Sequence, residues 1–99
     1  MNMQKLMQEA QKMQAKLLKE QEEIEKTTYE GSSSNVSVVV NGKKDVVSVK
    51  LNLDDDFSKD DVELLEDMIL VALNDAMKKA DSDKEQRMSK YGNGLSGLM

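Results

Sequence analysis

Residues 2–26 contain no glycine, no proline and a single β-branched residue, Ile24. Most other positions are Gln, Lys, Glu, Met, Leu or Ala, all of which are good helix formers. A helix of this length extends over roughly 37 Å, which is more than a chain of 99 residues can cover with its own structure. We therefore expect a long helix that either packs on a sheet of its own chain or projects as an arm.

One face of this helix carries apolar side chains at the heptad spacing of a coiled coil. The spacing breaks where Glu20 takes the next position. The pattern favours contact with another apolar surface, on the same chain or on a second one. The series comprises Met3, Leu6, Ala10, Met13, Leu17 and Ile24.

Two valine-rich segments around Asn41 and Gly42 predict a β-hairpin. An Asn-Gly pair is a strong signal for a tight turn, because both residues tolerate positive φ. The first strand covers residues 36–40. In the second, residues 46–53, apolar and polar side chains alternate, so we expect one buried and one solvated face. The buried face would comprise Val47, Val49, Leu51 and Leu53, and the solvated face Ser48, Lys50 and Asn52.

An additional short strand is expected to begin at residues 27–29. Gly31 and the three serines that follow it indicate a flexible loop. This loop would separate the short strand from the hairpin.

A second helix is predicted after an acidic segment. Ser58, with Asp61 three residues later, has the spacing of a helix N-cap and its capping box. Residues 68–73 are all apolar, so this helix has no solvated side there and needs cover on several faces. One sheet and one other helix cannot surround it, and we expect a second copy to complete the cover. The predicted dimer interface comprises Leu65, Met68, Ile69, Ala72 and Leu73.

The chain length predicts a single domain. Beyond residue 80 the sequence is polar and still compatible with a helix, and three glycines then mark the C-terminal end. We expect the domain to cover residues 1–91 and a flexible Gly-rich tail to cover residues 92–99.

The charge of the chain, −5 in total, is unevenly distributed. Residues 1–19 hold four lysines against one glutamate, and residues 54–75 hold nine acids against one lysine. Residues 20–53 carry a net −2 and residues 76–99 a net +2. Basic charge therefore lies toward the two helical ends of the chain, and acidic charge lies in its middle.

The absence of His and Cys excludes most catalytic and metal-binding constellations. An EF-hand loop starting at Asp54 would need Gly and Glu where the chain has Lys59 and Leu65. Gly31 and its serines lack the Lys-Ser/Thr partner of a phosphate-binding loop. We expect no enzymatic activity, no metal, no cofactor and no small-molecule substrate. The first residues are too polar for a signal peptide or a membrane span, so we expect no membrane contact.

Four lysines share one face of the predicted first helix, roughly opposite its apolar series. One interpretation is a solvated face that keeps the apolar series inward. The other is a stripe that contacts nucleic-acid phosphates. A sequence pI near 4.7 and a scarcity of Arg predict that such binding is weak, salt-sensitive and poorly specific. The stripe comprises Lys5, Lys12, Lys16 and Lys19, and a looser second patch comprises Lys84, Arg87 and Lys90.

The order of these segments is characteristic as a whole. A Met/Gln/Lys-rich helix leads to a Glu-Gly-Ser segment, a valine-rich strand ending in NGK, a second strand and an acidic helix. The most specific parts are QKMQ at 11–14, EGS at 30–32, VNGK at 40–43 and LLEDMILVALNDA at 64–76. In this order the chain resembles the YbaB/EbfC family of bacterial nucleoid-associated proteins over essentially all of its length.

The resemblance implies an α+β protomer of order α-β-β-β-α, with a long N-terminal helix, a small antiparallel sheet and a long C-terminal helix. It implies a tweezers-shaped homodimer with helical arms on a shared β body. It further implies binding of double-stranded DNA with little sequence preference, in the cytoplasm at the nucleoid, and roles in nucleoid organisation and gene regulation. DNA contact in the family is associated with the helices, which corresponds here to the two basic patches.

An alternative function of another class is a protein-interaction module without a physiological nucleic-acid role. The acidic balance of the chain and its Met-rich first helix favour this alternative, because methionine surfaces adapt to varied partners. Binding to DNA near physiological salt distinguishes the two.

Overall fold

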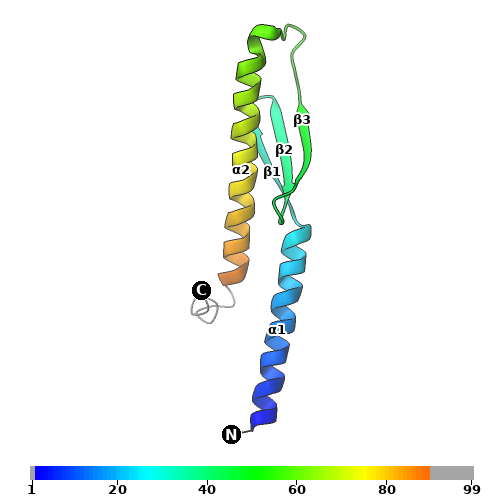
Figure 1. Cartoon of the computed structure of the whole chain (residues 1–99), viewed down its shortest axis with the longest axis vertical. Helices are drawn as coiled ribbons and strands as arrows, with labels where there is room; N and C mark the ends of the chain where they lie inside the picture. The colour runs from blue at the N-terminus through cyan, green and yellow to red at the C-terminus, as the bar shows by residue number, and fades with distance from the viewer. Residues whose placement is uncertain (1, 90–99) are drawn as a thin grey trace.

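The computed structural model describes residues 2–89 as two long helices joined by a three-stranded antiparallel sheet (Figure 1). This confirms the predicted α+β order. Lys90 and the predicted tail, residues 92–99, lie outside the described residues. In chain order the elements are α1 (Met3–Lys26), β1 (Thr28–Ser33), β2 (Val36–Asn41), β3 (Val46–Leu51), the 3-10 turn η1 (Lys59–Asp61) and α2 (Val62–Ser89).

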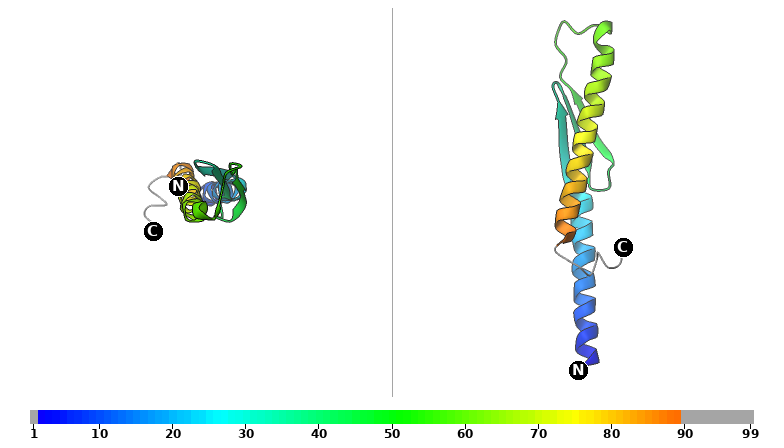
Figure 2. Two further views of the ribbon diagram at one scale, coloured as in Figure 1. Left: turned by 90° about the horizontal axis from the view of Figure 1, so that it is seen from above. Right: turned by 90° about the vertical axis from the view of Figure 1, so that its left-hand side faces the viewer.

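The body of the protein consists of the sheet, in the order β1-β2-β3, with α2 packed across β1 and β2 (Figure 2). Small side chains on α2 let it approach the sheet closely. At Gly31 the approach is so close that an added Cβ would lie 2.1 Å from the Ala72 carbonyl oxygen and 2.4 Å from the Ala76 nitrogen. The buried core comprises Val36, Val38, Val40, Ala72, Ala76 and Ala80.

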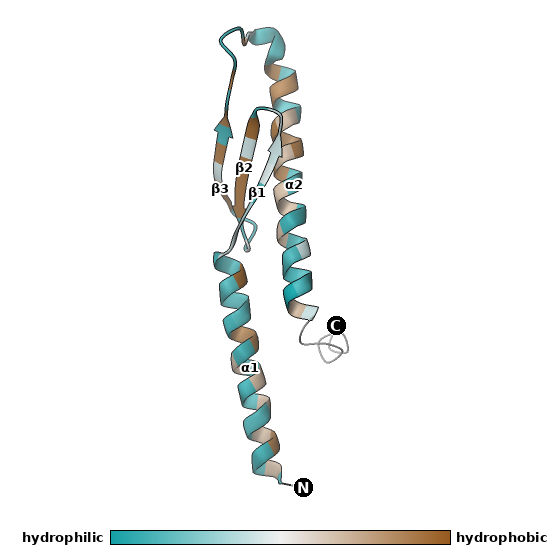
Figure 3. Ribbon diagram, turned by 180° about the vertical axis from the view of Figure 1, so that it is seen from behind, coloured by the Kyte–Doolittle hydropathy of each residue, from teal (hydrophilic) through white to brown (hydrophobic). Residues whose placement is uncertain are grey.

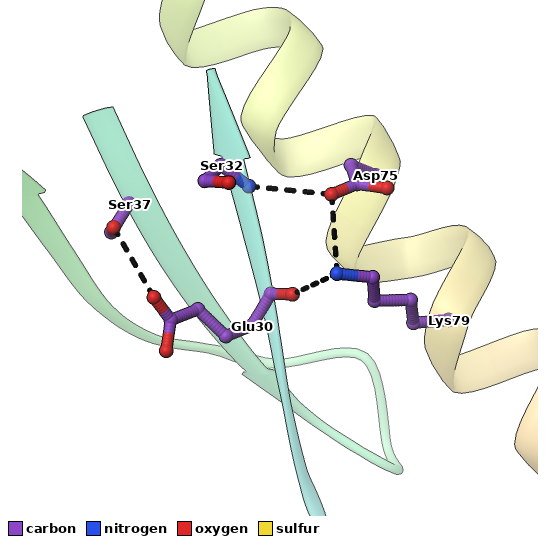
Figure 4. A network of polar contacts seen from close by, with 5 residues as sticks. All are labelled: Glu30, Ser32, Ser37, Asp75 and Lys79. Carbon is purple, nitrogen blue, oxygen red and sulfur yellow. Dashed lines mark hydrogen bonds and ion pairs between the residues drawn. The ribbon is translucent and has the colours of Figure 1, made fainter. Parts of the chain in front are cut away.

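Side chains of α2 also bind the outer edge of β1 (Figure 4). The Ser32 N–H donates to Asp75 Oδ2 at 3.3 Å, and Lys79 Nζ donates to the Glu30 carbonyl oxygen at 2.8 Å. Lys79 and Asp75 form an ion pair at 3.4 Å. The predicted loop is therefore wrong for Gly31, Ser32 and Ser33, which pair with β2 inside β1. Cover by α2 stabilises a strand of low intrinsic propensity.

The turn between β2 and β3 does not use the positive φ values that the sequence predicts for Asn41 and Gly42. The left-handed residue is Lys44, with φ 68°, rather than Asn41 or Gly42. The Asn41 side-chain oxygen accepts hydrogen bonds from the N–H groups of Lys43 and Asp45, at 2.9 and 3.0 Å, and so closes the loop. Glycine is required at position 42 because α1 is close, and not because of the turn. A Cβ at this position would lie 1.8 Å from the carbonyl oxygen of Ile24 in α1.

The predicted buried face of the second hairpin strand is exposed in the protomer. Val49 and Leu51 lie opposite Val38 and Val36 of the core, yet 47% and 44% of their surfaces are exposed, because α2 covers only β1 and β2. The alternation also shifts near Val47, where a bulge places Val46 opposite Val40. Strand β3 ends at Leu51, so Leu53 lies beyond it.

Helix α1 projects from the end of the body as an arm (Figures 1 and 3). It contacts the body at its C-terminal end, where Ile24 is its one buried residue. The rest of the apolar series is uncovered, with Met3, Leu6 and Met13 at 71%, 47% and 59% exposure. Of the two predicted arrangements, the projecting arm is the one observed, and it makes the molecule 73 Å long and 21 Å wide.

The predicted capping box of Ser58 and Asp61 is present at the 3-10 turn η1, which leads directly into α2. Ser58 Oγ accepts from the Asp60 N–H at 3.3 Å, and Asp61 Oδ2 accepts from the Ser58 N–H at 3.0 Å. These acids lie at the positive end of the helix dipole, which they stabilise. The polar residues beyond position 80 continue this helix as far as Ser89.

Candidate nucleic-acid interface

The lysine stripe of α1, comprising Lys5, Lys12, Lys16 and Lys19, is exposed along its whole length. At 100° per residue the four side chains lie within about 60° of one another around the helix. From the first to the last they extend over about 21 Å. One strand of duplex DNA presents about six phosphates over this distance.

The stripe faces away from the body. The opposite side of α1 carries Gln21, Ile24 and Glu25, which line a cavity of about 560 Å³ between α1, the tip of the β2–β3 hairpin and α2. Because the stripe is on the far side of the helix from these residues, the described part of the chain does not cover it. A long polyanion can lie along this side of the arm.

The second predicted patch is divided. Lys84 is exposed and lines the cavity between the helices, so it faces the inner side of α1 rather than the stripe. Arg87 Nε forms an ion pair with Asp83 Oδ2 at 3.0 Å, and each side chain is about 30% exposed. Lys90 lies outside the described residues. The structure therefore does not join this patch to the stripe on one surface.

Asp83 links Arg87 to the start of the sheet. The Tyr29 hydroxyl donates a hydrogen bond of 2.5 Å to Asp83 Oδ2. Burial raises the pKa of Tyr29 above its ordinary value of 10.0, and the hydrogen bond and negative charge of Asp83 raise that pKa further. This polar cluster fastens the C-terminal half of α2 to β1, so Arg87 has a structural role.

Two lysines at the hairpin tip were missed by the sequence interpretation. Lys43 and Lys44 line the cavity at the root of the arm, and Lys44 Nζ pairs with Asp81 Oδ1 at 2.6 Å. Their position directly after Asn41 and Gly42 in a predicted turn was the available signal. This signal indicated that the two lysines are exposed, but not that residues of α1 and α2 line the same cavity beside them.

The acidic charge lies at the other end of the molecule. Residues 54–67 form the loop after β3 and the first turns of α2, and this end lies far from the free end of α1 (Figure 1). The molecule is 73 Å long, whereas the Debye length at physiological salt is about 8 Å. The acidic end therefore hardly weakens the field around the lysine stripe, although it dominates the net charge.

The predicted dimer residues all contact the core of the protomer itself. Ala72 is fully buried in the protomer core, and Leu65, Met68, Ile69 and Leu73 pack partly against that core. Leu65 and Met68 also line a cavity beside the loop after β3. The side of α2 toward the β2–β3 hairpin carries Ala80 and Lys84. Leu73 lies two turns before Ala80, and Leu70 lies about four turns before Lys84, so both are on this side of the helix.

An uncovered apolar face results on that side of the body. We define the apolar face as Val49 and Leu51 of β3 with Ile69, Leu70 and Leu73 of α2. Leu70 is 57% exposed, and Val49 and Leu51 are nearly as exposed. Large apolar side chains exposed together on neighbouring elements are typical of an interaction surface.

Other site chemistries are limited in the described structure. Residues 2–89 contain no group of three or more acidic, His or Cys side chains placed to hold a metal ion. Neither α1 nor α2, as far as each is described, is long and apolar enough to cross a membrane.

Comparison with known proteins identifies the relatives of the chain. The YbaB/EbfC DNA-binding family matches residues 1–95. A nucleoid-associated protein of Chloroflexus aurantiacus is 42% identical over 99% of this chain and 99% of its own. Proteins with the same name from Ligilactobacillus salivarius and Ruminiclostridium cellulolyticum are 36% and 42% identical, over 99% and 98% of this chain and 95% and 85% of theirs.

Proposed function

This chain belongs to the YbaB/EbfC DNA-binding family, and from that premise we propose that it is a homodimer whose α1 arms bind double-stranded DNA with little sequence preference. It is a nucleoid-associated protein and not an enzyme. The proposed role is the organisation of the nucleoid, with effects on gene regulation that follow from occupancy of the DNA.

The single observation that carries the DNA contact is the exposed lysine stripe on α1, on the side away from the body. Ammonium groups at helical spacing can follow a DNA backbone and release its counterions. Phosphate contacts of this kind position a protein on DNA without reading its bases. Lysine is a point charge, and it lacks the planar fork with which Arg reads guanine. Weak sequence preference follows.

The proposed dimer is supported by the apolar face. Its residues Val49, Leu51 and Leu70 are about half exposed in the protomer, and a domain of this size gains much of its stability from additional apolar cover. A two-fold axis through the face would bury the same residues from both copies. The two arms would then extend from one body, and each would offer its stripe to the same duplex.

Anisotropy of a labelled 30-bp duplex, measured from ~50 to ~200 mM NaCl, tests the DNA contact. For four phosphate contacts the affinity should fall roughly 100-fold over this range. The variant Lys5/Lys12/Lys19→Gln should reduce the slope of log K against log salt by up to about 2.7 per arm engaged. A second duplex of scrambled sequence should bind with an affinity within a few-fold of the first.

The matched control is Lys50/Lys59/Lys78→Gln, which removes the same charge from exposed positions of the body. It should leave the salt slope nearly unchanged, because long-range charge effects are screened. Equal slopes for the arm variant and wild type would reject the stripe as the contact. An absence of DNA binding by wild type at ~50 mM NaCl would reject the function itself and favour a protein-interaction module.

A further inference from the structure

The tip of the β2–β3 hairpin holds the end of the arm. The Gly42 N–H donates a hydrogen bond of 3.0 Å to the carbonyl oxygen of Thr27, the residue that follows α1. The Gly42 backbone also lies so close to Ile24 that an added Cβ would be 1.8 Å from the Ile24 carbonyl oxygen. The last turn of α1 is therefore joined directly to the tip of this hairpin.

An ion pair joins the same hairpin tip to α2. Lys44 Nζ lies 2.6 Å from Asp81 Oδ1, and the backbone of Lys44 takes the left-handed conformation within the tip, with φ 68°. Lys79 and Asp75, by contrast, form an ion pair within α2. The hairpin tip is thus bound on one side to the arm and on the other side to α2.

The remaining contacts between the arm and the body are few. Ile24 is the one buried residue of α1, and the main contacts of α1 with the sheet are with β2. Beside the hairpin tip, a cavity of about 560 Å³ lies between α1 and α2. No broad packed surface therefore fixes the direction of the arm, and the contacts at the hairpin tip gain importance.

We propose that the tip of the β2–β3 hairpin sets the direction of the arm, and that the Lys44–Asp81 ion pair holds this tip against α2. Lys44 and Asp81 are then positioning residues, since neither belongs to the lysine stripe. Their side chains are 51% and 56% exposed, so dissolved salt weakens their attraction. The arm consequently tilts more freely as the salt concentration rises.

A small tilt at the root of the arm produces a large displacement at its free end. From Met3 to Ile24 the helix extends over about 31 Å. A tilt of about 20° displaces the free end by about 11 Å, which is close to the width of a DNA major groove, about 12 Å. In the proposed dimer the same tilt changes the separation of the two lysine stripes. Only this consequence for DNA rests on the proposed function.

The distance between two spin labels tests the control of the arm. The chain has no cysteine, so Gln4→Cys on the arm and Asn74→Cys on α2, both at exposed positions, each take one label. An excess of unlabelled chain restricts the measured distance to one copy. With no further substitution we expect a narrow distribution at ~50 mM NaCl and a broader one at ~500 mM NaCl.

Substitutions of the ion pair should reproduce the effect of salt. At low salt, Lys44→Gln and Asp81→Asn should each raise the population outside the original distribution about two- to fivefold. The reversed pair Lys44→Asp/Asp81→Lys should restore the narrow distribution. The matched control is Lys79→Gln, which removes an exposed ion pair within α2 and should leave the distribution unchanged. Circular dichroism confirms that each variant is folded.

The contact between Gly42 and α1 supplies an independent test. In Gly42→Ala the new Cβ would press on the Ile24 carbonyl oxygen, while the Lys44–Asp81 pair remains in place. This variant should shift the mean distance by several ångströms. The ion-pair variants should instead change mainly the width of the distribution.

DNA affinity separates the direction of the arm from simple charge. Lys44→Gln makes the chain more negative by one charge, and Asp81→Asn makes it less negative by one. Charge alone would weaken DNA binding in the first variant and strengthen it in the second. Loss of arm direction should instead weaken binding to the duplex in both, by about two- to fivefold at ~100 mM NaCl.

Three results would overturn the proposal: distributions for Lys44→Gln and Asp81→Asn equal to that of the unsubstituted arm, broadening by Lys79→Gln as large as that by Lys44→Gln, or an unchanged mean distance in Gly42→Ala. Opposite changes in DNA affinity for the two ion-pair variants would refute the consequence for DNA. The proposed DNA function is judged separately, because the spin-label distances are measured without DNA.

Discussion

The body and the arm of this protein use apolar residues in opposite ways. In the body, the valines of β2 and the alanines of α2 are buried against each other with almost no exposed surface. In the arm, Met3, Leu6 and Met13 are spaced as regularly but remain about half exposed or more. The same helical periodicity therefore specifies a packed core in α2 and an open surface in α1.

The difference arises from what each helix can reach. Helix α2 lies along the sheet, and the two together form the core. Helix α1 contacts the body only near its C-terminal end, where Ile24 is its one buried residue. Stability is thus expected to reside in the body and binding in the arm. The separation also places the lysines of α1 far from the acids of residues 54–67, which allows an acidic protein to contact DNA.

The largest expected effect is that of Gly31→Ala in the body. The new Cβ would meet backbone atoms of Ala72 and Ala76 at 2.1 and 2.4 Å, and neither atom can yield without moving α2 from β1. We expect a loss of about 3 kcal/mol or more in the free energy of unfolding, measured with urea. Gly42→Ala, which meets the end of α1 instead, should cost less because the arm can tilt. A larger cost for Gly42→Ala would reverse the comparison.

Leu70→Asp tests the apolar face with a change that the protomer should tolerate, since Leu70 is 57% exposed. A charge buried in a dimer interface without a partner should weaken the dimer by about 2–4 kcal/mol. Val71→Asp is the control, with similar exposure but a position about 100° around the helix. Analytical ultracentrifugation at ~300 mM NaCl measures both; a dimer equally strong in the two variants would place the interface elsewhere.

A third prediction compares two residues of one apolar series. Ile24→Ala should lower the free energy of unfolding by about 2 kcal/mol, because Ile24 is 3% exposed and packs at the arm root. Leu6→Ala should change it by less than about 0.5 kcal/mol, because half of Leu6 is already exposed. Similar losses in both variants would show that the free part of α1 is packed in solution.

The smallest expected effect is a dependence on alkaline pH from Tyr29. Its pKa is raised in the folded protein by burial and by Asp83, so the folded state holds the phenol proton more tightly than the unfolded state. The resulting stability is present below about pH 10 and is lost as pH rises through the raised pKa. Tyr29→Phe should remove this loss. Tyr91→Phe leaves Tyr29 as the one tyrosine of the chain. If an absorbance titration of this variant gives Tyr29 a pKa at or below its ordinary value, the result contradicts the structure.

The sequence predicted the order of elements, the long first helix and the capped turn that leads into α2, because each depends on local signals. Ser58 and Asp61 form the capping contacts that their spacing indicates, and residues 2–26 form a helix with few breaks in propensity. The lysine stripe followed from the same helical periodicity.

Other features depended on contacts between distant segments. Ser32 and Ser33 form a strand because Asp75 and Lys79 of α2 bind its edge. Gly42 is required by Ile24 rather than by the turn. The partner of Arg87 is one turn away in α2, but Tyr29, which completes that cluster, is 54 residues from Asp83. No local pattern indicates such neighbours.

The assignment of DNA contact to the arm is tested most directly by amide chemical shifts of the ¹⁵N-labelled protein during titration with a 30-bp duplex. The account predicts that the largest changes follow α1 around Lys5, Lys12, Lys16 and Lys19, while the β2 core and residues 54–67 change little. Changes concentrated on the sheet or at the start of α2, with an unaffected α1, would contradict it.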